Sequence, residues 1–336
     1  MARTKFSFWS DAADEEYFVV KLKKGTEELT AINAIHDHIS NSIYQVLGVC
    51  TANLYIGYYQ KMLALISKVL PGYKDLIEWL NNKNALEEIE QYNKVDEFVN
   101  AYKKFESDLS INGKESLLAA AIILEDLDVL GAGLRNIGLI KFSGKHQIIK
   151  IDPSDSIFDI PSDRIDAALA KFESNLSWDN PLIYSLFSLS KVCNNPNNIL
   201  GNLHFSEFFH DIDKEKLKYE LAKFTSLDDA YIKKLIIRDE YIELLSMDDK
   251  KLYLEQLSNL LVRKKNILKK TLNLPEIKVT PPEPAPVFIK DAVFSEPVEH
   301  IKHGASKPFK VKRIVPSKDL DADLVSCTSD FMMKIV

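Results

Sequence analysis

Two aspartates, an asparagine and a third aspartate near the middle of the chain are residue types that can carry phosphate chemistry. Asp126 and Asp128 come first, Asn136 follows a short loop, and Asp152 ends the apolar segment beyond it. In phosphoryl transfer, one Asp positions the attacking hydroxyl, and an Asn with a second Asp holds the magnesium that neutralises the phosphates. The order and approximate spacing of these residues therefore favour phosphoryl transfer from a nucleotide.

The segments around these residues have patterns that would position them. Gly131 and Gly133 lack a Cβ, so the loop backbone can pass close to a ligand. Residues 115–124 are apolar nearly all round, which predicts a buried helix before the loop. Residues 138–151 predict a β-hairpin with its turn at Ser143-Gly144. The polar loop is thus expected between a buried helix and a hairpin.

A strand and a helix near the N-terminus supply the next candidates. Residues 17–21 are mostly aromatic or β-branched and end at Lys21, which predicts a short strand. From residue 27 to about 48, apolar residues repeat every three or four positions, which predicts an amphipathic helix. Residues 49–59 return to strand character.

The remaining chain is mostly helical in pattern until it becomes rich in proline. Further helices are predicted at 62–70, 76–79, 95–105, 165–172, 181–192, 205–209, 214–224, 228–237 and 250–272. Eight of the 13 prolines lie between Pro275 and Pro316, which indicates a linker and an extended tail. The whole pattern predicts an α+β fold.

Composition narrows the classes of protein to consider. The chain has 336 residues, of which 46% are hydrophobic, so it can bury a sizeable core. Its net charge of -6 argues against a dedicated nucleic-acid binder. The 3 cysteines are widely spaced, unlike a disulfide framework or a zinc site. The N-terminus lacks the apolar region of a secretory signal, and no transmembrane segment is expected.

Three stretches resemble parts of a known group of kinases. Residues 46–55 resemble the run that follows the first long helix in HipA-like kinases, and residues 125–138 resemble a loop of Legionella-type bacterial effector kinases. Ile149-Lys-Ile-Asp152 resembles the metal-binding strand of those effectors. They are atypical kinases, remote relatives of the HipA and phosphatidylinositol 3/4-kinase families and of the protein kinase superfamily.

This resemblance implies a two-lobed protein-kinase-like fold. Residues 1–58 would form a reduced N-lobe, and residues 59–272 a mostly helical C-lobe with the catalytic loop and metal strand. Residues 273–336 would form a Pro-rich linker and tail that binds a membrane or a partner.

The resemblance also assigns roles to residues. Asp128 is the favoured catalytic residue, with Asp126 as the alternative, since Asp126 could instead orient the loop from behind. Lys21 would bind the phosphates of ATP. Asp37 is the nearest acidic residue in register to orient that lysine, with Glu27 and Glu28 as alternatives. Asn136 and Asp152 would bind ATP through Mg²⁺ or Mn²⁺.

The implied function is an atypical protein kinase that phosphorylates Ser/Thr hydroxyls of a host protein. It would be a secreted bacterial effector in the host cytoplasm, working in solution or peripheral to a host membrane. A phosphoinositide kinase and a pseudokinase acting as a binding module remain alternatives. The first twenty residues contain no glycine, so a Gly-rich phosphate loop is missing. An anionic activator is therefore expected to order the reduced N-lobe.

Positive charges gather at the end of the last long predicted helix. They belong to Arg263, Lys264, Lys265, Lys269 and Lys270. One interpretation is a solvated helix end, where cations interact favourably with the helix dipole. The other is a site for an inositol polyphosphate, a phosphoinositide headgroup or anionic lipid. The sequence leaves both interpretations open.

Overall fold

A computed structural model describes most of the predicted elements. The described residues are 17–22, 27–59, 62–68, 70, 72–76, 111–126, 129–130, 136–142, 145–151, 164–178, 208–209, 211–288, 292–297 and 309–313. Asp128 and Asp152 lie outside this set, as do the helices predicted at 95–105 and 181–192. For Lys21 the structure describes the strand but not the side chain.

The described chain mixes helices and strands, as the sequence predicts. The helices are α1 (Glu27–Val46), α4 (Lys114–Leu124), α5 (Ile165–Asn175), α8 (Lys214–Thr225), α9 (Asp229–Ile236), α10 (Asp239–Leu244) and α11 (Lys250–Thr271). The strands are β1 (Tyr17–Leu22), β2 (Cys50–Thr51), β3 (Leu54–Tyr59), β4 (Met62–Lys68), β5 (Lys74–Asp75), β6 (Ile111–Asn112), β7 (Ile137–Phe142), β8 (Lys145–Lys150), β9 (Ala292–Pro297) and β10 (Phe309–Arg313).

The first sheet joins the N-terminal strand to the end of the chain. Its five strands have the order β3-β4-β1-β10-β9. Lys21 pairs with Leu65 of β4, and Phe18 pairs with Phe309 of β10, so β1 is an interior strand. The helix predicted at 62–70 is wrong, because this segment is β4. A short apolar run fits a buried strand as well as a buried helix, and here pairing with strands on both sides decides.

The second sheet contains the predicted hairpin. Its path is β2-β8-β7-β5, with β6 also paired to β8. Strands β7 and β8 pair antiparallel from Ile137 opposite Lys150 to Phe142 opposite Lys145, which confirms the hairpin. Strand β2 runs parallel to β8, with Thr51 opposite Lys150. The end of β8 is therefore held from both sides.

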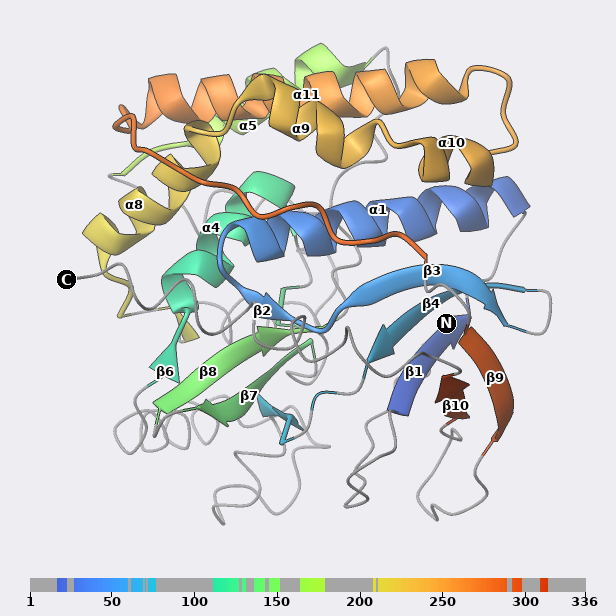
Figure 1. The fold of residues 1–336 in the computed structure, drawn as a ribbon. Helices are drawn as coiled ribbons and strands as arrows, with labels where there is room; N and C mark the ends of the chain where they lie inside the picture. Colours follow the sequence, from blue (N-terminus) through green and yellow to red (C-terminus); the bar gives the residue numbers. More distant parts are fainter. Residues whose placement is uncertain are drawn as a thin grey trace, which may run out of the picture.

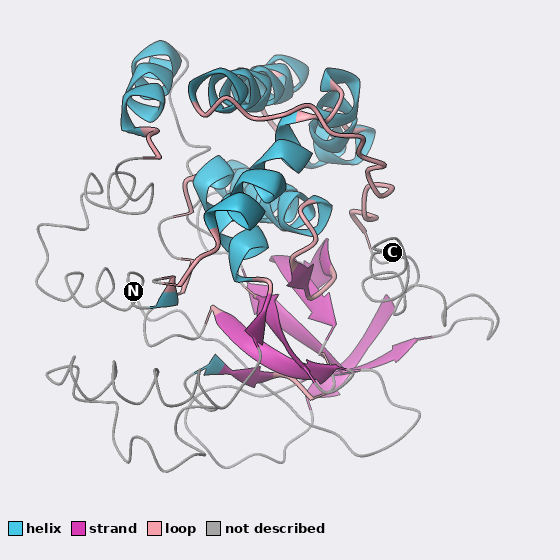
Figure 2. Cartoon of the chain, turned by 90° about the vertical axis from the view of Figure 1, so that its left-hand side faces the viewer, coloured by secondary structure: helices cyan, strands magenta, loops and turns pink. Residues whose placement is uncertain are grey.

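Helix α1 lies between the two layers of the molecule. In Figure 1 it runs below α9 and α10 and above β3 and β4, and Figure 2 shows the helices gathered on one side of the strands. The helix contacts β2, β3 and β4 as well as α4 and α9. Its apolar face is buried, with Ile35 and Ile39 at 0% exposure. Helix α4 is buried nearly all round, as its composition predicts.

The proline-rich segment 274–288 packs against the folded core. In Figure 1 it runs from the end of α11 across α1 to β3. Arg238 Nη1 donates to the Ala285 carbonyl at 2.6 Å, and the Ile56 N–H donates to the Val287 carbonyl at 2.7 Å. The segment is extended, as predicted, and it leads into β9 and β10.

The three predicted segments of the chain touch one another in the described structure. Strand β10, in the predicted tail, pairs with β1, in the predicted N-lobe. The boundary predicted at residue 58 falls within β3. The domain boundaries and the two-lobed arrangement stay predictions. Within the described ranges, no helix has both the length and the apolar character needed to cross a membrane.

Candidate active site

The β7–β8 hairpin brings the first of the candidate residues into place. Asn136 directly precedes β7, and Ile151 directly follows β8. The Ile151 N–H donates to the Asn136 carbonyl at 2.8 Å, so the antiparallel pairing extends to this end of the hairpin. The Asn136 N–H donates to the Leu130 carbonyl at 3.1 Å, which fixes the loop to the hairpin. Asn136 is fully buried.

The loop before Asn136 begins at a defined helix end. Glu125 has a left-handed backbone conformation with φ 50°, a common way to end a helix. The next N–H, that of Asp126, donates to the Ala121 carbonyl at 2.9 Å. This turn directs the Asp126 side chain into the protein interior, where its exposure is 0%.

Asp126 is held by two side chains that are also buried. The Tyr44 hydroxyl of α1 donates to Asp126 Oδ2 at 2.6 Å, and Lys150 Nζ lies 3.2 Å from the same oxygen. Lys150 Nζ also donates to the Val129 carbonyl at 3.0 Å. Burial, and then the Asp126 charge, raises the pKa of Tyr44 well above its usual value, so the hydroxyl keeps its proton.

Asp37, the predicted partner of Lys21, is one of several buried polar residues of α1, and His36 and His38 flank it in the sequence. Asp37 is 4% exposed. His36 Nε2 lies 2.5 Å from the Tyr253 hydroxyl. His38 Nε2 lies 3.2 Å from the Pro286 carbonyl, which only accepts, so Nε2 carries the proton and Nδ1 accepts from the Tyr241 hydroxyl at 2.7 Å. The pairing of Lys21 with Asp37 stays a prediction.

The five basic residues at the end of α11 each have a carboxylate partner. Arg263 pairs with Asp166 at 2.6 Å, Lys264 with Glu125 at 2.5 Å, Lys265 with Asp229, Lys269 with Glu276, and Lys270 with Glu173 at 3.9 Å.

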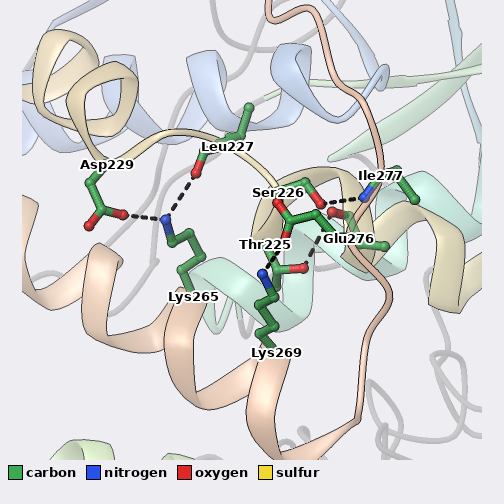
Figure 3. Close-up of polar contacts among 9 residues, drawn as sticks. Thr225, Ser226, Leu227, Asp229, Lys265, Lys269, Glu276 and Ile277 are labelled. Carbon is green, nitrogen blue, oxygen red and sulfur yellow. Dashed lines mark hydrogen bonds and ion pairs between the residues drawn. The ribbon is translucent and has the colours of Figure 1, made fainter.

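Burial separates these five residues into two groups. Lys264 is 1% and Lys265 is 8% exposed, so they are not part of an exposed basic surface. Figure 3 shows Lys265 between Asp229 and the Leu227 carbonyl, and Lys269 beside Glu276. The sequence suggests an anion site or a solvated helix end for these five charges. In the structure they form ion pairs that join α11 to neighbouring segments.

Sequence reasoning missed Tyr44 and Lys150 as parts of this region. Tyr44 follows Ile43 within the apolar pattern of its helix and is indistinguishable there from a core aromatic residue. Lys150 carries a signal that could have been used, because it is a charge that interrupts the apolar run from Ile148 to Ile151. Such a lysine is either at an edge or paired in the interior, and the structure pairs it.

The two candidate metal ligands have side-chain oxygens, which suit a hard divalent cation. The side-chain oxygens of Asn136 and Asp152 are of the kind that Mg²⁺ prefers, with phosphate oxygens completing its coordination. Among the described residues, which include Asn136 but not Asp152, no group of three or more His, Cys, Asp or Glu is placed to hold a metal ion.

Comparison with known proteins gives only distant similarities. No family model and no curated protein matches the chain. Among solved structures, the chain is similar to the Helicobacter pylori proinflammatory kinase CtkA, with 13% identity and a TM-score of 0.45 over 80% of this chain and 94% of that one. It is also similar to the HipA, HipB and operator DNA complex of a Shewanella oneidensis MR-1 toxin–antitoxin system, with 14% identity and a TM-score of 0.38 over 78% of this chain and 61% of that one. Because both similarities are distant, we argue function from this chain's own residues.

Proposed function

We propose that the chain is an atypical kinase that transfers the γ-phosphate of ATP to a Ser or Thr hydroxyl of a protein. One observation carries the proposal. The Ile151 N–H donates to the Asn136 carbonyl, so Asn136 lies opposite Ile151. Ile151 directly precedes Asp152 in the sequence. An Asn and an Asp from one hairpin end, following a loop with a second Asp, form the set that phosphoryl transfer uses.

Each residue of the set has a role in this proposal. Asp128 accepts a hydrogen bond from the substrate hydroxyl and orients it for attack on the phosphate. Asn136 and Asp152 hold Mg²⁺, which when bound neutralises charge on the phosphate oxygens. Lys21, on an interior strand of the first sheet, binds the nucleotide phosphates, and buried Asp37 is the residue proposed to orient it. We expect the substrate to be a host protein, as the resemblance to effector kinases implies.

The test is transfer of radiolabelled phosphate from ATP in the presence of magnesium and whole host-cell extract. We compare the wild type with Asp152→Ala and with the control Asp248→Ala, an exposed Asp in the turn before α11. The wild type and the control should label protein, and Asp152→Ala should lose at least about 100-fold in rate, the order expected for losing a group that stabilises transition-state charge. Full transfer by Asp152→Ala would refute the proposal.

Two other outcomes would replace the proposed substrate or activity. Label in extracted lipid and none in protein would indicate a lipid kinase. Thermal stabilisation by magnesium and ATP without any transfer would indicate a nucleotide-binding module without kinase activity.

A further inference from the structure

Asp126 has surroundings that differ from those of a group acting on substrate. Its exposure is 0%, and its Oδ2 is shared between the Tyr44 hydroxyl at 2.6 Å and Lys150 Nζ at 3.2 Å. A residue that handles a substrate proton must come within hydrogen-bond distance of it. A carboxylate whose Oδ2 already holds two donors from the protein is not free to accept the substrate hydroxyl there.

The partners of Asp126 come from parts of the chain far apart in sequence. Tyr44 lies on α1, Asp126 follows α4, and Lys150 ends β8. Lys150 Nζ also reaches the Val129 carbonyl at 3.0 Å and lies 5.8 Å from the centre of the Tyr44 ring. Tyr44 and Lys150 are both at 0% exposure, so bulk water does not substitute for a lost partner.

The cluster is directly connected along the chain to the proposed reacting groups. In the sequence, Leu127 alone separates Asp126 from Asp128, and Ile151 alone separates Lys150 from Asp152. Val129, whose carbonyl Lys150 binds, is the residue after Asp128. A shift of the cluster therefore moves the backbone on both sides of the loop.

We propose that Tyr44, Asp126 and Lys150 form a buried positioning cluster that fixes the loop carrying Asp128 against helix α1 and the end of strand β8. Asp126 is then a positioning residue and Asp128 acts on the substrate. The inference rests on the proposed kinase function for its effect on rate, but the positioning itself does not.

The decisive variants change single functional groups. Tyr44→Phe removes one hydroxyl and leaves the ion pair intact, and Asp126→Asn keeps the side-chain shape but removes the charge. Tyr231→Phe is the matched control, because its hydroxyl also donates one bond, to the Pro282 carbonyl at 2.7 Å, away from this cluster. Amide hydrogen exchange at Asn136 reports the backbone bond that holds the loop to the hairpin, and exchange at Ile151 reports the bond that closes the end of the hairpin.

Tyr44→Phe should speed exchange at these two amides and lower kcat, each by about 10-fold, the order expected for losing one hydrogen bond to a charged group. Asp126→Asn should change both by at least as much, because it leaves the Lys150 ammonium buried without its carboxylate. The KM for ATP should rise by less than kcat falls, since the proposed phosphate ligand Lys21 is not in the cluster, whereas the proposed metal ligands Asn136 and Asp152 adjoin it. Asp126→Asn combined with Lys150→Met should lower kcat no more than either change alone, because the two side chains act through each other. The control should change neither exchange nor kcat.

Two results would overturn the inference. One is loss of all transfer in Asp126→Asn while Tyr44→Phe keeps the wild-type kcat and exchange, which would make Asp126 the residue acting on substrate. The other is unchanged exchange in both single variants. If Lys150→Met does not fold, Tyr44→Phe still decides. If the wild type transfers no phosphate, the proposed function fails, and the exchange measurement alone decides whether the cluster positions the loop.

Discussion

Lys264 gives the sharpest test of how the end of α4 is stabilised. Its Nζ lies 2.5 Å from Glu125 Oε2, 3.4 Å from the Ile123 carbonyl and 5.2 Å from the centre of the Phe172 ring. The Lys264 side chain is 2% exposed and that of Glu125 is 15% exposed. Lys264→Met keeps most of the aliphatic packing and removes the charge, so Glu125 loses its cation and two interactions at the helix end are lost.

Removing one partner of a buried ion pair costs about 3–5 kcal/mol in the free energy of unfolding. Glu125 is partly exposed, and water would relieve some of this cost, so we expect about 3 kcal/mol. An entropy of unfolding of about 2.1 cal/mol/K per residue over 336 residues gives about 0.7 kcal/mol/K, so the melting temperature should fall by roughly 4 °C.

Lys270→Met is the matched control on the same helix. Lys270 also pairs with a glutamate, Glu173, but at 3.9 Å and with its side chain 83% exposed. Exposed pairs of this kind contribute about 0–1 kcal/mol. Urea unfolding followed by circular dichroism measures both variants. Equal losses of stability in the two would refute the reasoning that burial, and not the presence of an ion pair, sets the contribution.

Two further predictions test other parts of the fold. Burial lowers the pKa of His38 from 6.5 to about 4, so this side chain resists protonation in the folded protein, whereas the unfolded chain takes up a proton near pH 6.5. The stability that neutral His38 contributes should therefore be fully present above pH 6.5. The free energy of unfolding should fall by about 3 kcal/mol on acidification towards pH 4. In urea titrations His38→Gln should show a correspondingly smaller loss over this range, and an unchanged pH dependence would contradict the assignment. Gly138→Ala would place a Cβ 2.3 Å from the Lys74 carbonyl oxygen and 2.4 Å from the Tyr73 ring, which should cost about 1–3 kcal/mol by forcing β5 from β7. Gly57→Ala meets only the flexible end of Ile66 at 2.7 Å, so thermal unfolding should show a smaller loss, and the reverse order would be inconsistent with this packing.

Local patterns were sufficient to predict several elements around the candidate site. The hairpin of β7 and β8 is encoded by residues next to one another in the sequence. The periodic apolar pattern likewise predicts α1 and α11, and the all-round apolar composition predicts the burial of α4. These signals depend on short-range geometry and survive without knowledge of the rest of the fold.

Contacts between distant segments could not be predicted in this way. The bond between Tyr44 and Asp126 joins residues separated by 82 positions, and Lys264 contacts Ile123 across 141 positions. Nothing in the local sequence distinguishes a lysine that enters the core from one that faces water. For the same reason β4 was predicted as a helix, since its pairing with β1 and β3 depends on the whole sheet.

The pairing of β1 with β10 has a consequence for how the protein is made. On a ribosome, β1 and its partner β4 emerge close together in time. Its other partner, β10, and the carbonyl groups of Pro286 and Val287 that bind His38 and Ile56 emerge much later, after α11. One edge of β1 must therefore wait unpaired while all the segments between β4 and β10 are translated. Such long-range pairing slows folding and leaves one edge of β1 exposed until β10 arrives. The nascent chain is therefore most vulnerable to aggregation at the first sheet.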